Sequence, residues 1–166
     1  MSDCYYDTAG CLVCPEQEAS AAVPSRIDHT AVLGWTAGAN SIDQLDDGLH
    51  VVFTMPLGVV GVVIGLRSGR ANPTSPGLIE HGFYFQCTGG VDLYQPMERG
   101  KPILDVLNDR GTDTQFEIRR QGSVITYLIN NAPVGDTVLA TSTQPSNGPK
   151  VVTACLFASG DSAPSG

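Results

Sequence analysis

Apolar and polar residues alternate along much of this chain with the two-residue period of β-strands. The alternation is clearest in Gln115–Arg119, where Phe116 and Ile118 stand between polar residues. After Gln121-Gly122 the chain continues as the apolar-rich segment Val124–Ile129. Two such segments joined by a short glycine turn predict a β-hairpin.

A second hairpin is predicted by an aromatic-rich segment that precedes two glycines. Phe83–Cys87 is followed by Gly89-Gly90 and then by Val91–Tyr94. Further strands are expected at His29–Trp35, His50–Met55, Val59–Leu66, Ile103–Leu107, Thr137–Ala140 and Val151–Ala158. Val59–Leu66 is apolar on both faces, which is typical of a central strand. About ten short strands without a helical window predict an all-β sandwich or barrel.

The segments between these strands carry turn-forming residues. Thr36–Ser41 is expected to be a turn, and Arg67–Glu80, with two glycines and two prolines, a long loop. The length of 166 residues suits a single domain with appendages. We expect a cysteine-rich arm and linker at 1–27, a β-sandwich at 28–159 and a flexible tail at 160–166.

Composition narrows the function classes. Charged residues make up only 16% of the chain, and the net charge is −8. A nucleic-acid partner requires clustered cations, whereas the single adjacent basic pair is Arg119-Arg120, so nucleic acid is excluded. No apolar run approaches the length of a membrane span. The N-terminal residues lack the pattern of a secretory signal, so we expect synthesis in a cytosol.

Three of the five cysteines lie in the N-terminal arm. Cys4, Cys11 and Cys14 are spaced C-x6-C-x2-C, and Pro15 follows directly. Thiolates at this spacing can bind one metal ion, and a proline after the last cysteine occurs in iron–sulfur runs. Zinc or an iron–sulfur cluster needs a fourth ligand, which is unknown; Cys87, Cys155 or a neighbouring subunit are the options. Disulfides and unreactive thiols remain as alternatives.

Catalysis is not expected. A glycosidase needs two carboxylates facing one cleft, but Asp43, Asp46 and Asp47 cluster in a turn and Glu117 stands alone. His29, His50 and His81 are scattered, without a nucleophile motif near them. Trp35 could stack on a sugar, but the small residues after it favour a ring packed under a loop.

Three segments of the chain carry a similarity to a known type of module. The similarity lies in Gly34–Ser41, in Val63–Leu66 and in Glu117–Tyr127, and it extends over about 28–158. Asn130-Asn131 replaces the usual Asn-Gly turn, which asparagine tolerates. The resemblance is to concanavalin A-like jelly-roll β-sandwich modules of bacteriophage tail and baseplate minor structural proteins.

This resemblance implies a function outside catalysis. It implies a virion structural protein of a tail tip or baseplate, assembled in the bacterial host cytoplasm and oligomeric within the assembly. Its partners would be other tail or baseplate proteins, and a host surface glycan is a further option. The alternative is a carbohydrate-binding adhesin module whose loops at 67–80 and 108–114 hold a sugar.

Overall fold

The protein is built from antiparallel strands, and no helix longer than one 3-10 turn, η1 (Pro76–Leu78), occurs among the described residues. A computed structural model provides the coordinates. It describes residues 5–6, 12–13, 26–28, 34–35, 37–41, 48, 50–69, 71–131, 135–158 and 162–164.

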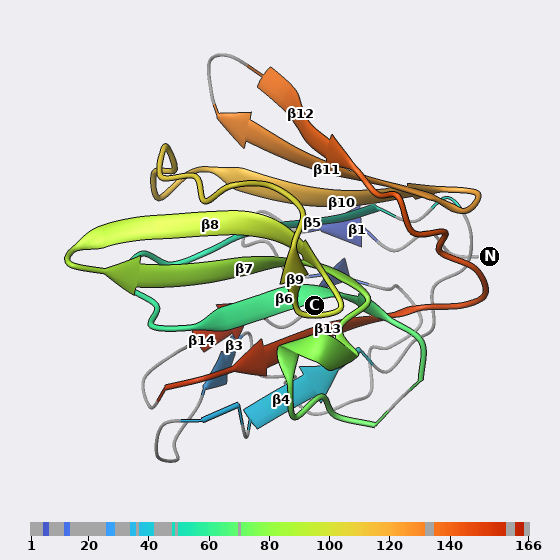
Figure 1. The fold of residues 1–166 in the computed structure, drawn as a ribbon, viewed down its shortest axis with the longest axis horizontal. Coiled ribbons are helices and arrows are strands. Elements are labelled where there is room, and N and C mark those ends of the chain that lie inside the picture. Colours follow the sequence, from blue (N-terminus) through green and yellow to red (C-terminus); the bar gives the residue numbers. More distant parts are fainter. Residues whose placement is uncertain are drawn as a thin grey trace.

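Two sheets form the body of the molecule (Figure 1). The smaller sheet has the order β12 (Gly135–Thr141), β11 (Val124–Asn131), β10 (Gln115–Gln121) and β5 (His50–Thr54). The larger sheet has the order β4 (Ala37–Asn40), β13 (Val151–Leu156), β6 (Val62–Arg67), β7 (His81–Thr88), β8 (Val91–Glu98) and β9 (Lys101–Pro102). Two short ladders pair β1 (Tyr5–Tyr6) with β2 (Leu12–Val13) and β3 (Arg26–Asp28) with β14 (Ser162–Pro164).

The two predicted hairpins are confirmed. Gln121 pairs with Val124 across the turn that Gly122 opens with φ of 59°. Thr88 likewise pairs with Val91 around Gly89 and Gly90, whose φ angles are 60° and 79°. Positive φ angles match the turn to the right-handed twist of the strands, and glycine adopts them at little cost.

The alternation in β10 and β11 creates the inner face of the four-stranded sheet. Phe116 and Ile118 are fully buried, and Ile125 and Tyr127 of β11 are buried on the same side. Phe83 and Phe85 of β7 meet them from the other sheet, with ring centroids 5.3 Å and 4.7 Å from that of Phe116. Burying these rings between two sheets is the main stabilising contribution of such a core.

The six-stranded sheet is covered on its outer side as well. Val63 and Cys155 point outward and are fully buried by Ile79 of the loop that precedes β7. Trp35 packs at the edge of this second cluster, with ring centroids 6.2 Å from Tyr84 and 5.3 Å from Phe157. Because β6 is buried on both faces, its prediction as a central strand is correct.

Thr36–Ser41, expected as a turn, contains the strand β4 instead. The small residues of β4 allow close packing: a side chain at Gly38 would lie 2.2 Å from the carbonyl oxygen of Pro73. Of the expected strand His29–Trp35, residues 29–33 lie outside the described residues, and Gly34 and Trp35 form a bend.

Ile103–Leu107, expected as a strand, is irregular. Leu107 makes only an isolated bridge to Tyr94, and β9 forms the edge of the sheet instead. Its apolar residues are divided between two environments: Ile103 and Leu107 pack on the core, whereas Leu104 and Val106 are exposed.

Two segments beyond the expected sandwich pair with each other. Ser162–Pro164, in the stretch expected to be a flexible tail, is the strand β14. It pairs with β3, which spans the expected boundary between arm and sandwich at residues 27 and 28.

The expected strand Val59–Leu66 begins later, at Val62. The carbonyl oxygen of Val59 instead accepts a hydrogen bond from the Cys87 amide.

Candidate functional site

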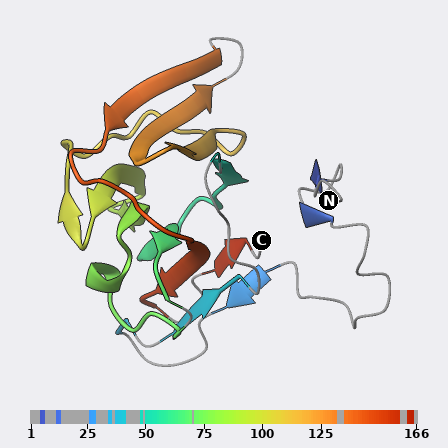
Figure 2. The ribbon, with the colours of Figure 1, turned by 90° about the vertical axis from the view of Figure 1, so that its right-hand side faces the viewer.

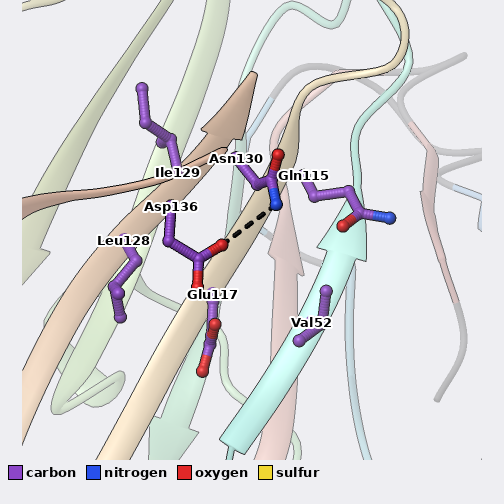
Figure 3. A pocket seen from close by; sticks show the side chains of 7 residues that line it. All are labelled: Val52, Gln115, Glu117, Leu128, Ile129, Asn130 and Asp136. Carbon is purple, nitrogen blue, oxygen red and sulfur yellow. Dashed lines mark hydrogen bonds between the residues drawn. The ribbon is translucent and has the colours of Figure 1, made fainter. Parts of the chain in front are cut away.

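The outward face of the four-stranded sheet carries a small hollow of about 60 Å³ (Figure 3). We call it the sheet hollow. Polar side chains rim it and apolar side chains form much of its floor. Its lining residues are Val52, Gln115, Glu117, Leu128, Ile129, Asn130 and Asp136.

Strand register brings these residues together from four strands. Glu117 of β10 lies opposite Val52 of β5 on one side and opposite Leu128 of β11 on the other. Asn130 of β11 lies opposite Gln115 and, across the other ladder, opposite Asp136 of β12. Because alternate residues share a face, the alternation that buries Phe116 and Ile118 turns Glu117 outward.

A network of hydrogen bonds fixes the charged groups of the sheet hollow. Arg119 Nε donates to Glu117 Oε1 at 2.7 Å, and Arg119 Nη2 donates to Oε2 at 3.0 Å. His50 Nδ1 lies 3.1 Å from the same Oε1. Burial alone would raise the pKa of Glu117, but the hydrogen bonds from Arg119 and His50 outweigh it and lower that pKa.

Asp136 closes the network on the β12 side. Asn130 Nδ2 donates to Asp136 Oδ1 at 3.0 Å, the bond drawn in Figure 3. The other carboxylate oxygen, Oδ2, lies 3.7 Å from Arg119 Nη2. Amide and carboxylate groups beside apolar side chains can recognise a hydroxylated ligand by hydrogen bonds, and the small volume limits it to a shallow contact.

A second polar cluster lies at one end of the sandwich, where Lys150 is buried, Glu80 is partly buried and Ser68 is exposed. Lys150 Nζ donates to Glu80 Oε2 at 2.6 Å and to Ser68 Oγ at 2.8 Å, and the Lys150 side chain is only 2% exposed. Burial alone would raise the pKa of Glu80, but hydrogen bonds from Lys150 and Ser68 lower it to about 2.

His81 also lies in the interior at this end. Its Nδ1 atom is 3.5 Å from the Tyr127 hydroxyl and 4.0 Å from Glu98 Oε1. Burial lowers the pKa of His81, against the raising influence of the Glu98 and Glu80 carboxylates. The contact between His81 of β7 and Tyr127 of β11 joins the two sheets, so these groups serve packing.

The cysteines proposed as metal ligands, Cys4, Cys11 and Cys14, lie outside the described residues. Two candidates for the fourth ligand are described, and both are free thiols. Cys155 is buried, donates to the Pro73 carbonyl at 3.7 Å and has a pKa raised to about 11 by burial. Cys87 is partly buried. No group of three or more His, Cys, Asp or Glu side chains suited to a metal occurs among the described residues.

The other residues considered from the sequence are dispersed. Asp43, Asp46, Asp47 and His29 lie outside the described residues. His50 and Glu117 meet at the sheet hollow, whereas His81 is interior. Trp35 is half-buried against Tyr84 and Phe157, in agreement with the structural interpretation of that ring.

The loops suggested as sugar-binding segments do not contribute to the sheet hollow. Residues 67–80 cover the six-stranded sheet, with Pro73 and Ile79 buried. In residues 108–114, Arg110 is anchored inside, where it donates to the carbonyl oxygens of Met55 and Pro56 and to Asp92.

Sequence reasoning missed the other polar residues of the sheet hollow. Gln115 belongs to the same alternating segment and faces the same side as Glu117, so the strand period was a usable signal for it. Asn130 was assigned to a turn and Asp136 to no element. The meeting of these two residues depends on the ladder between β11 and β12, which no local pattern specifies.

A comparison with solved structures bears on the fold. No protein-family model and no curated protein matches the sequence. Among solved structures, the PSpry domain of TRIM65 matches with a TM-score of 0.55 over 98% of this chain and 85% of that domain, at 10% identity. The fold is therefore an all-β, two-sheet sandwich of the concanavalin A-like jelly-roll type, as the sequence predicted. No helix among the described residues is long and apolar enough to cross a membrane.

Proposed function

We propose that this protein is a non-catalytic assembly or host-contact module of a bacteriophage tail tip or baseplate. The resemblance of residues 28–158 to such modules supports the viral setting, and the concanavalin A-like sandwich is compatible with it. The protein would be made in the host cytoplasm and built into the virion, beside other tail or baseplate proteins.

The state of Glu117 is the observation that carries the non-catalytic part of the proposal. A glycosidase acid must hold its proton near neutral pH, which requires a raised pKa. The pKa of Glu117 is lowered, because Arg119 donates two hydrogen bonds to its carboxylate. At the sheet hollow the other carboxylate, Asp136, also contacts Arg119 and accepts a bond from Asn130. Neither group is arranged as a proton donor.

The N-terminal arm is proposed as the attachment to the assembly, with zinc or an iron–sulfur cluster bound through Cys4, Cys11 and Cys14. The test compares two variants in particle assembly: deletion of residues 1–27 and the triple change of these cysteines to serine. We expect the truncated sandwich to fold but to be absent from particles, and the triple variant to lose bound metal. Normal incorporation of both variants, with no metal in the purified parent protein, would contradict the proposal.

Carbohydrate binding is the second candidate, and the sheet hollow is the observation that favours it. Gln115, Asn130 and Asp136 offer amide and carboxylate groups beside the apolar Val52 and Leu128. A glycan array with the parent protein and Asn130→Ala is the test. Reproducible binding that this substitution removes supports the candidate, and a blank array with folded protein rejects it.

A further inference from the structure

The strand β12 lies at the free rim of the four-stranded sheet. Both ribbon views place it at the outer limit of the molecule (Figures 1 and 2). It pairs with β11 on one side, and no described strand pairs with its other side. The backbone N–H and C=O groups along such an edge are a template for another strand.

The edge of β12 has few of the devices that normally prevent such pairing. Charges, prolines, bulges or extreme shortness normally block an exposed edge. The rim strand of the other sheet, β9, has a charge, a proline and extreme shortness, because it consists of Lys101 and Pro102 alone. In contrast, β12 has seven residues without lysine, arginine or proline.

The side chains of β12 are also suited to pairing. Asp136, Thr137 and Val138 are all exposed, and Val138, at 58%, is the most exposed of the large apolar residues described. The one charge of the strand is compensated within the chain, since Asp136 is bound to Asn130 and lies near Arg119. A bulge at Leu139, which the ladder to β11 leaves without a partner, confines regular pairing to Gly135–Val138.

We propose that two copies of this chain associate through antiparallel pairing of β12 with β12, which joins their four-stranded sheets into one. A twofold axis at Thr137 places the two Thr137 residues opposite each other and sets Asp136 opposite Val138 of the partner. No carboxylate then directly faces another, and β-branched residues meet across the axis, which favours pairing. This inference concerns the sandwich alone and does not depend on the viral assignment.

The charge of the protein sets the conditions under which the dimer forms. Each chain carries a net charge of −8, so two copies repel each other at low ionic strength. In about 0.5 M salt the screening length falls to roughly 4 Å, and long-range repulsion is removed. The contact is one short strand pair, so we expect association at about 10 µM to 1 mM and stronger association in high salt.

Sedimentation velocity of the full chain over that concentration range, in low and high salt, is the test. We expect a monomer–dimer equilibrium that Val138→Glu weakens at least tenfold, because the new carboxylate would directly face Asp136 of the other copy at two symmetric positions. Val124→Glu is the matched control, because Val124 lies in the adjacent strand, is 48% exposed and is absent from the proposed contact. Circular dichroism establishes that both variants fold. If Val138→Glu does not fold, Thr137→Lys provides a second edge variant, because it places two lysines opposite each other on the twofold axis.

Hydrogen exchange gives a second, local measurement. Amides of β12 should become more protected as concentration rises, whereas those of β5, the opposite edge, should not. A protein that stays monomeric throughout overturns the proposal. So does a trimer or open chain with protection of β5, because this would indicate head-to-tail pairing of β12 with β5. Equal loss of association in Val124→Glu and Val138→Glu also overturns it, since the added negative charge alone would then be the cause.

Discussion

Two carboxylates of this protein, Glu80 and Glu117, are bound to basic side chains in different surroundings. The partner of Glu80 is Lys150, which is 2% exposed and lies 2.6 Å away. The partners of Glu117 are Arg119, 37% exposed, and His50, 63% exposed. Both carboxyl pKa values are lowered by these hydrogen bonds.

The difference lies in what happens when a partner is removed. Arg119 belongs to the same strand as Glu117 and can turn to water, so that pair is local and replaceable. Lys150 lies 70 positions from Glu80 along the chain and has no access to water, so its charge depends on that carboxylate. A buried cation without its partner is costly, whereas an exposed one is solvated. The network around Glu117 is therefore the one that tolerates a change of partner, because its basic side chains are solvated although the Glu117 side chain itself is only 11% exposed.

The largest effect should come from Glu80→Gln. The substitution leaves the buried Lys150 ammonium without a counter-charge, and we expect a loss of about 3 kcal/mol in the free energy of unfolding. Urea denaturation followed by tryptophan fluorescence measures it. The double variant Glu80→Gln with Lys150→Met is the control, and it should recover most of the loss. If Glu80→Gln alone is as stable as the parent, the buried charge of Lys150 does not depend on Glu80.

Acid should produce the next largest effect, in a defined pH window. Because the pKa of Glu80 falls from 4.5 to about 2 on folding, its ionised form stabilises the folded state above pH 4.5. That contribution, roughly 2–3 kcal/mol, is lost as the pH falls from 4.5 towards 2. Denaturation midpoints across this window should decline less steeply in the Glu80→Gln/Lys150→Met variant than in the parent. If the denaturation midpoints of the two proteins fall equally steeply with pH, another titrating group dominates the loss of stability in acid.

The smallest effect should come from Glu117→Gln. Its partners are exposed, so we expect a loss below about 1 kcal/mol, reduced further by salt. The same urea measurement at low and high salt tests this. A loss as large as that of Glu80→Gln would show that the network at the sheet hollow stabilises the fold. It would then no longer be a candidate binding surface.

Much of the sandwich could be predicted because its strands carry local signals. The segment around Phe116 and the glycine turns at Gly89 and Gly122 specify hairpins through side-chain period and backbone conformation alone. Strand β4 could not be predicted, because Ala37, Gly38 and Ala39 have low strand preference. It forms through pairing with β13, more than a hundred residues later, and through close packing of Gly38 on Pro73.

The candidate site was less predictable than the fold. Glu117 was recognised as an isolated carboxylate of an alternating strand. The polar residues that bind it or share the sheet hollow with it come from β5, β10, β11 and β12. Which of them meet depends on the registers of β5, β11 and β12 against β10 and on the bulge in β12. Register follows from tertiary packing, which the sequence pattern of one strand does not contain.

The pairing of β3 with β14 determines how the sandwich would respond to a pulling force. Arg26 lies opposite Pro164 and Asp28 opposite Ser162, so the chain leaves this ladder at the same end on both strands. Tension applied between residues 25 and 165 would therefore load the ladder in unzipping geometry, in which the residue pairs break one after another. In shear geometry all pairs would bear the load together. This short ladder would yield at low force before the β6–β13 ladder in the body of the sandwich bore any load, and the released segments would act as an extensible tether.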